Sequence, residues 1–445
     1  MLCKKRAVRA TVVLALLALI AISGCSLFAE DGEAPGTAEG DQIPTPAATP
    51  TAADTPESTP VNATPQRLTL RIWMIAGLTP AEEGPAATLL GEQLAAFDAS
   101  HPDLDLLVET KAPAGQGGIL AYLRSGRSVA PEILPDLVVL PSEQLAAAAS
   151  ENLVIPLDDL LADETVADLY PAARELVQHE DNLYGYPLTL SNLQHAAFIT
   201  GNVYSDTAPT QFDQLLTVEG AAYATAARGS PGAELALQFY LAEGGTLTLE
   251  NGQPLLDVEI LATALEHFER GRVEGTILIR SGNLSTLDDV WSLLENGAAN
   301  LVHSSAAVYL GQRPIPINIS FARQPGPQGG LPALVRGRAL AISTTDPVNQ
   351  ALATELLEWL AAPQNLGAWS FAANRLPARE SAFEAWNPTA YNAFLDNELA
   401  RAQAFPPQAT NTLLSALGNA MFDVISSGVA ARTAAEDVVA TLQSP

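Results

Sequence analysis

The sequence predicts an α/β fold of about two domains, on the basis of three observations. Residues 67–445 form a stretch of 379 residues, which is too long for one ordinary hydrophobic core. Near its start, strand-like runs flank a helical pattern, and this order predicts a βαβ unit in a doubly wound sheet. The chain's two cysteines, Cys3 and Cys25, precede this stretch, so its core alone must hold it together.

The expected strands are apolar runs bounded by polar residues. The first two, residues 68–74 and 104–109, flank the predicted helix. The third, residues 137–140, is short and continuously apolar, as in a parallel strand covered on both faces.

The expected helix at residues 86–100 has one apolar stripe. Leu90, Leu94 and Phe97 recur at helical spacing, and Pro102 ends the helix because the residue before a proline leaves the helical region. Tryptophans on later helical patterns are expected in the core, at positions 291, 359 and 369.

Residues 181–192 read as an extended segment after a polar turn. Tyrosines and alternating leucines favour a strand. Pro187 lacks an N–H group, so we do not expect it in a central, fully paired strand. Such a segment suits a chain that crosses between two bodies.

Residues 1–24 have the pattern of a secretory signal peptide. Four basic residues precede an uncharged apolar run at residues 10–22, which is shorter than the ~20 residues that span a bilayer. The run ends in Ile22-Ser23-Gly24-Cys25, which resembles the lipobox of bacterial lipoproteins. This resemblance implies that Cys25 is lipidated and anchors an extracytoplasmic protein to the cell membrane. An ordinary cleaved signal with a chance cysteine is the alternative.

Residues 25–66 are expected to form a lipidated N-terminus and a disordered linker. The stretch from residue 29 has no lysine or arginine and contains five Thr-Pro pairs, so it cannot bury a core. Without residues 1–24 the chain has 18 basic and 50 acidic residues, a net charge of −32. This charge disfavours nucleic-acid binding because it repels phosphates.

Short sequence motifs, in order along the folded region, resemble those of bacterial extracellular solute-binding proteins of family 1, the maltose-binding-protein-like receptors of ABC importers. They are Pro135-Asp136-Leu137-Val138, Pro156-Leu157-Asp158-Asp159-Leu160, Tyr184-Gly185-Tyr186-Pro187, Pro209-Thr210-Gln211-Phe212, Asn296-Gly297-Ala298-Ala299 and Arg375-Leu376-Pro377-Ala378-Arg379. The family's usual tryptophan is replaced by Phe212, and Phe198-Ile199 stand where it has Tyr-Asn.

The resemblance implies a two-lobed periplasmic-binding-protein-like fold of type II with a ligand cleft between the lobes. The implied N-terminal lobe is 67–185 plus 328–375, and the C-terminal lobe is 190–318 plus 380–445. Chain crossings are expected near 186–189, 319–327 and 376–379. The implied protein is a monomer that captures a small solute and delivers it to an ABC transporter permease by hinge closure. A ligand-sensing receptor on the same scaffold is an alternative.

The candidate ligand contacts lie where predicted strands end, because open α/β sheets bind ligands there, except Arg338, which lies near the expected mouth of the cleft. They are Trp73, Glu143, Ser191, Asn192, Gln194, Ser304, Tyr309 and Arg338. Neutral hydroxyl and amide groups with aromatic faces suit a mono- or oligosaccharide, and we favour a neutral one. Trp73 is either a platform for a sugar ring or a core residue, and Glu143 is either a hydroxyl acceptor or a solvated acid. The competing ligand is a sugar acid held by Arg336 or Arg338.

Catalytic motifs are missing from the sequence. The five histidines have no paired metal spacing, and there is no nucleophile elbow or phosphate loop. We therefore expect no enzyme, no cofactor and no metal. A secreted hydrolase with dispersed catalytic residues is the remote alternative.

Overall fold

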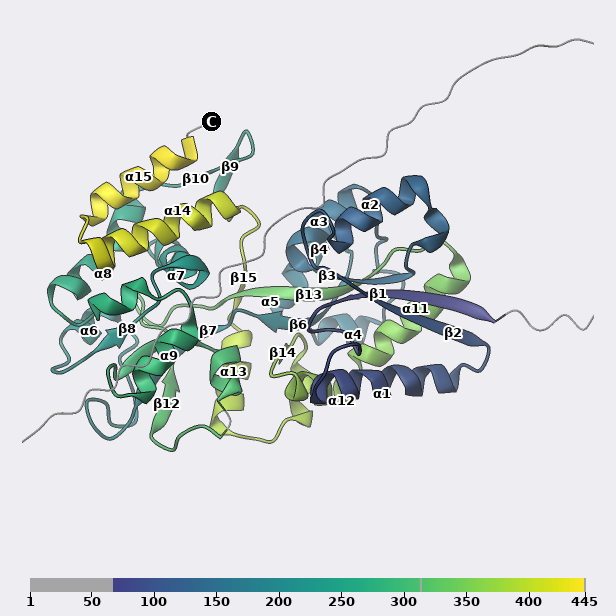
Figure 1. The fold of residues 1–445 in the computed structure, drawn as a ribbon, viewed down its shortest axis with the longest axis horizontal. Coiled ribbons are helices and arrows are strands. Elements are labelled where there is room, and N and C mark those ends of the chain that lie inside the picture. Colours follow the sequence, from purple (N-terminus) through teal and green to yellow (C-terminus); the bar gives the residue numbers. More distant parts are fainter. Residues whose placement is uncertain (1–66, 313, 444–445) are drawn as a thin grey trace, which may run out of the picture. The chain divides into compact units, whose positions relative to one another are not determined.

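The computed structural model describes residues 67–312 and 314–443 (Figure 1). The expected signal peptide, Cys25 and the linker lie outside the described residues. Within these ranges the chain forms two β-sheets, each with its own helices, and two short hairpins. No helix in the described ranges is long and apolar enough to cross a membrane.

The larger sheet has the strand order β14-β6-β13-β3-β1-β2, and β15 pairs with β13. Its strands are β1 (Leu68–Ile75), β2 (Leu104–Lys111), β3 (Leu137–Pro141), β6 (Tyr186–Ser191), β13 (Leu334–Ile342), β14 (Leu376–Pro377) and β15 (Gln403–Ala404). β1 pairs in parallel with both β2 and β3, which confirms the predicted βαβ unit. β13 runs antiparallel to β3 and β6.

Helices connect the strands of the larger sheet and cover it. Those along the first half of the chain are α1 (Pro85–Ser100), α2 (Ile119–Val129), α3 (Ser142–Ser150), α4 (Asp163–Ala167), α5 (Pro171–Glu175) and the 3-10 turn η1 (Pro131–Ile133). Those along the second half are α11 (Pro347–Ala361), α12 (Pro363–Ala372) and the 3-10 turn η3 (Glu380–Ala385). The next helix, α13 (Ala390–Leu399), contacts the smaller sheet through Tyr391, which is hydrogen-bonded to His195. The strands β4 (Gln178–His179) and β5 (Asn182–Leu183) form a small hairpin before β6.

The smaller sheet has the order β12-β7-β11-β8. Its strands are β7 (Gln194–Ile199), β8 (Tyr223–Ala224), β11 (Leu301–Ser305) and β12 (Ile319–Ala322). The surrounding elements are α6 (Phe212–Leu216), α7 (Gly229–Ala242), α8 (Val258–Val273), α9 (Leu287–Glu295), α10 (Ala306–Gly311), α14 (Asn411–Phe422), α15 (Ala431–Gln443), the 3-10 turn η2 (Ile279–Asn283), the π-helical turn η4 (Asp423–Ser427), and the hairpin β9 (Thr248–Glu250) and β10 (Gln253–Leu255).

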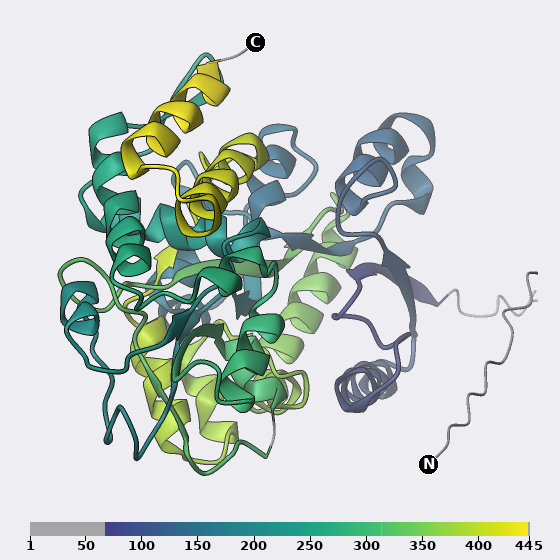
Figure 2. The ribbon, with the colours of Figure 1, turned by 60° about the vertical axis from the view of Figure 1, so that its left-hand side comes forward.

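Alternation along the strands gives the smaller sheet two buried faces. Ala196 and Phe198 belong to one hydrophobic cluster, with α7, α8, α14 and α15, which group around one another in Figure 2. Ala197 and Val302 belong to the other cluster, with α9 and α10. This second cluster continues into the core of the larger sheet, so the two sheets share one buried seam.

Pro187 lies in a strand that has neighbours on both sides, but the strand is not fully paired at this residue, as its missing N–H group predicts. β14 pairs only with Leu190 and Thr189 of β6 and ends before the proline. On the other side the register shifts, and Leu188 is an extra residue between the pairs of Thr189 and Pro187. The bulge and the short neighbour accommodate the missing donor.

Two of the three tryptophans on helical patterns are buried as predicted, at positions 291 and 369. The prediction is wrong for Trp359, which is 37% exposed. Its indole N–H donates to the Gln93 carbonyl, and its ring lies 6.5 Å from the Phe97 ring. Trp359 therefore covers the seam between α11 and α1 instead of filling the core.

Candidate functional site

Polar ends of strands from both sheets meet at a two-residue link. β1, β2, β3 and β6 run in the same direction, so their carboxyl ends lie at one edge of the larger sheet. In the smaller sheet β8 and β11 are parallel, and β11 ends beside the start of β7. Only Asn192 and Leu193 separate β6 from β7. Since open α/β sheets bind ligands at the carboxyl ends of their strands, this junction is the candidate site.

At the edge of the larger sheet, Glu143 and Arg338 lie close together. Arg338 Nη1 is 3.7 Å from Glu143 Oε2 and donates to the Gly337 carbonyl. Ser142 Oγ accepts a hydrogen bond from the Gly337 N–H at 3.0 Å. The Glu143 side chain is 45% exposed, so this is a solvated ion pair of about 0–1 kcal/mol.

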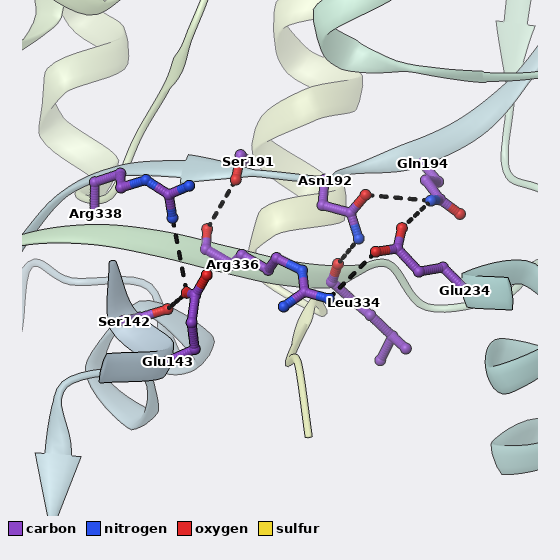
Figure 3. A network of polar contacts seen from close by, with 9 residues as sticks. All are labelled: Ser142, Glu143, Ser191, Asn192, Gln194, Glu234, Leu334, Arg336 and Arg338. Carbon is purple, nitrogen blue, oxygen red and sulfur yellow. Dashed lines mark hydrogen bonds and ion pairs between the residues drawn. The ribbon is translucent and has the colours of Figure 1, made fainter. Parts of the chain in front are cut away.

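A second, buried network joins the two sheets through Glu234 on α7 (Figure 3). Arg336 Nη2 donates to Glu234 Oε1 at 3.3 Å, and Gln194 Nε2 donates to Glu234 Oε2 at 2.7 Å. Burial raises the pKa of the Glu234 carboxyl, and the Arg336 charge opposes this shift. The Arg336 guanidinium also lies 3.4 Å from the centre of the Phe405 ring. Arg336 is thus held by a charge and by an aromatic face.

Ser191 and Asn192 attach the link to β13. Asn192 Nδ2 donates to the Leu334 carbonyl at 2.9 Å, and its Oδ1 accepts from Gln194 Nε2 at 3.2 Å. Ser191 Oγ reaches the Arg336 carbonyl at 3.5 Å. Asn192 has φ 68°, a left-handed conformation that asparagine tolerates better than most residues. The predicted trio Ser191, Asn192 and Gln194 therefore lies together at the junction.

Behind Gln194 lies a buried chain of neutral groups. Because the Gln194 amide donates to Glu234, its Oε1 accepts from His303 Nε2 at 3.0 Å. The other ring nitrogen then accepts from the Thr225 hydroxyl at 3.1 Å. Burial lowers the pKa of His303 to about 3, so its imidazole is neutral. The imidazole fixes the orientation of the Gln194 amide and carries no charge to a ligand.

The aromatic candidates and Ser304 are covered by protein in this structure. Trp73 is 3% exposed, its ring meets Tyr122 edge-on, and Lys111 Nζ lies 4.7 Å from its centre. Tyr309 is also buried and stacks on Tyr391 at 4.1 Å. Ser304 is fully buried, and its hydroxyl has no hydrogen-bond partner among the described residues.

The sequence analysis did not identify Glu234. It also did not identify a polar hollow that is lined in part by residues 228–230, just before Glu234 in the sequence. The hollow lies between the start of α7 and α14, and has a volume of about 410 Å³. Asn411, Ser415 and Asn419 line it at intervals of four residues on α14. This polar stripe in a mostly apolar helix is a signal that the sequence contains. Glu234 lies in a helix that is apolar on nearly every face, which predicts that the helix is buried, but the sequence gives no sign of its partners Arg336 and Gln194.

The polar strand ends of both sheets meet at one junction, which is the arrangement of a two-lobed binding protein. The described residues do not assemble a catalytic constellation there. The chain belongs to the family of bacterial extracellular solute-binding proteins, whose model matches residues 93–435. This is a family of binding proteins and not of enzymes. No curated protein sequence matches the chain.

Solved structures of similar fold are binding proteins with two lobes. The sugar-binding protein MalE of Xanthomonas citri has a TM-score of 0.66 at 18% identity, over 84% of this chain and 95% of that one. A cyclic alpha-maltosyl-1,6-maltose binding protein of Arthrobacter globiformis has a TM-score of 0.64 at 16% identity, over 85% and 99%. The maltotriose binding protein of Thermus thermophilus, bound with maltotriose, has 0.59 at 17%, over 84% and 98%. At these identities the likeness establishes the two-lobed fold.

Proposed function

We propose that this protein captures a mono- or oligosaccharide outside the cytoplasm and delivers it to the permease of an ABC importer. The junction of the two sheets carries the proposal, because hydroxyl, amide and charged side chains converge there from both sheets. Sugars need such a mixture of donors and acceptors. The sugar-binding proteins of similar fold support the same ligand class.

The proposal is tested by a thermal-shift screen over sugars, sugar acids, polyols, amino acids and peptides, followed by calorimetric titration of each hit. A ligand present at ~100 times its Kd should stabilise the fold by about 2.7 kcal/mol. Stabilisation by amino acids or peptides, with no response to any saccharide, would contradict the proposed ligand class.

We further propose that the two lobes close on the ligand about their chain crossings. Strand pairing supports a first crossing at Asn192–Leu193, slightly after the expected 186–189, because β6 stays in the larger sheet through Ser191. The passage of the chain from β12 of the smaller sheet to β13 of the larger one supports a second crossing near 319–327. The pairing of β14 with β6 and the hydrogen bond between Tyr391 of α13 and His195 of the smaller sheet support a third crossing after β14. Small-angle scattering should show compaction on addition of a tight ligand, and an unchanged scattering curve would contradict closure.

We also propose that Cys25 is lipidated and that the Thr/Pro-rich linker at 25–66 tethers a monomeric receptor to the membrane. The lipobox-like sequence supports this anchor, and the net negative charge of the chain would repel anionic lipid. Cys25→Ala should release the protein from the membrane fraction or leave an unprocessed precursor. Normal maturation and membrane attachment of this variant would refute the anchor.

A further inference from the structure

The hollow between α7 and α14 lies at a position where ligands of α/β sheets bind. It begins just after β8, at the carboxyl end of that strand, and its volume of about 410 Å³ is in the range of roughly 300–1,000 Å³ for small-molecule pockets. Its lining consists of Arg228, Gly229, Ser230, Asn411, Leu414, Ser415, Gly418, Asn419 and Phe422.

Close approach of the two helices shapes this hollow. A Cβ atom at Gly418 would lie 3.3 Å from the Gly229 carbonyl oxygen, so glycine at 418 lets α14 sit against the first turn of α7. Gly229 itself has φ 71°, which a residue with a side chain rarely adopts. The polar stripe of α14 therefore faces the same space as the start of α7.

Arg228 supplies the one charge in the lining. Its guanidinium carbon lies 3.8 Å from the centre of the Phe422 ring, which fixes the plane of the group. Arg228 is exposed, and no carboxylate among the described residues lies within ion-pair distance of it. By contrast, Arg336 is paired with Glu234 and Arg338 with Glu143. In a chain with 50 acidic and 22 basic residues, a pocket with an arginine and no acid is unusual.

The other donors of the hollow are neutral. Asn411, Asn419, Ser230 and Ser415 offer amide and hydroxyl groups. The first turn of α7 has no side-chain cap, so the partial positive charge of the helix end is added to that of the arginine. The charge and the donors together match an oxyanion attached to a hydroxyl-rich body.

We propose that the solute is an acidic saccharide whose oxyanion group, a carboxylate, sulfate or phosphate, binds Arg228 in this hollow. The inference rests on the proposed function and narrows its substrate class. It replaces the expectation of a neutral saccharide, which was based on residues that did not include Arg228. It also moves the sugar-acid alternative away from Arg336 and Arg338, because each already has a glutamate partner.

The test is calorimetric titration with acidic sugars and their neutral parents. The probes are the uronic acids, the 6-phosphates and the 6-sulfates of glucose, galactose and mannose, together with the three free hexoses and the matching disaccharides. Each probe is measured at low and high ionic strength with the wild type, Arg228→Gln and Arg228→Lys. Arg67→Gln is the control, because it removes the same charge from an exposed site that lines none of the pockets found in the described residues.

We expect at least one acidic sugar to bind and its neutral parent to bind more weakly. High salt should lower the affinity for the acidic sugar. Arg228→Gln should lower the affinity for that sugar by about 10- to 100-fold, the range for a lost hydrogen bond to a charged group. Arg67→Gln should leave this affinity unchanged. Arg228→Lys should recover part of the loss, since it restores charge without the planar fork. The class of probe that binds identifies the oxyanion.

Salt-independent binding of a neutral sugar that survives Arg228→Gln would overturn the acidic ligand and leave the saccharide proposal intact. Binding of a carboxylic acid without a sugar body, lost in Arg228→Gln, would overturn the saccharide class and keep Arg228 as the anion contact. No binding of any acidic probe would overturn this inference.

Discussion

Arg336→Gln should destabilise the fold far more than Arg338→Gln, the same change two residues further along β13. Glu234 is buried, with 6% of its side chain exposed, and Arg336 is its one cationic partner among the described residues. Breaking a buried pair by removing one partner costs ~3–5 kcal/mol. Because Arg336 keeps 24% exposure, water can reach the vacated site, so we expect about 3 kcal/mol, the lower end of that range. Arg338→Gln breaks a solvated pair and should cost less than about 1 kcal/mol.

The cost of Arg336→Gln should also depend on pH. Burial already raises the pKa of Glu234 above 4.5, and loss of the arginine removes the two main effects that oppose this rise. Between 4.5 and the raised pKa, the folded state binds more protons than the unfolded state, so the free energy of unfolding falls as pH increases. The variant should therefore lose less stability near pH 5 than at neutral pH, with each unit of extra shift worth about 1.4 kcal/mol.

Urea unfolding of both single variants and of the double variant Glu234→Gln/Arg336→Gln, at both pH values, checks this reasoning. The double variant should recover most of the loss, since it buries no unpaired charge. Equal costs for Arg336→Gln and Arg338→Gln, the same at both pH values, would refute the assignment of a buried pair.

Three further predictions concern buried side chains near the candidate site. Trp73→Ala should cost ~3–5 kcal/mol of unfolding free energy if the ring is core; a loss of saccharide affinity without loss of stability, measured by titration and denaturation, would instead identify a platform. His303→Gln should flatten the acid side of the stability profile, because the wild type loses stability as pH falls from about 6.5 towards a folded pKa of about 3; an unchanged urea midpoint profile between these pH values would contradict it. Ser304→Ala should leave stability unchanged or raise it by up to ~1–3 kcal/mol, because it removes a buried hydroxyl with no protein partner; marked destabilisation in thermal melts would show that the hydroxyl is satisfied.

Local pattern predicted the βαβ start of the fold well. Helical spacing of Leu90, Leu94 and Phe97 located α1 to within one residue, and each of the first three strands was placed with its start correct. Trp359 was misjudged because its environment depends on partners far away in the sequence. The packing of α11 against α1 decides the exposure of Trp359, whereas the short β14 and the bulge opposite Arg338 show how the sheet accommodates Pro187.

The candidate site was predicted in part for the same reason. Ser191, Asn192 and Gln194 are neighbours in sequence, so their common location follows from the end of one strand. Arg336 and Glu234 are 102 residues apart in the sequence, and Arg228 meets Phe422 where α7 packs against α14. A local sequence pattern cannot predict such long-range contacts. Charge pairing decided which arginines remain available, and pairing is a property of the folded chain.

The two-residue link between β6 and β7 would also amplify small backbone rotations. β6 and β7 are each six residues long and each is bonded within its own sheet, so each acts as a stiff arm of roughly 20 Å at ~3.3 Å per residue. A torsional change of ~10° at Asn192 or Leu193 would swing the far end of such an arm by roughly 3–4 Å, enough to make or break a hydrogen bond. Small changes in the left-handed backbone of Asn192 would thus displace the far ends of β6 and β7 by several ångströms. Residues that stiffen this link would change the lobe motion without contacting the solute.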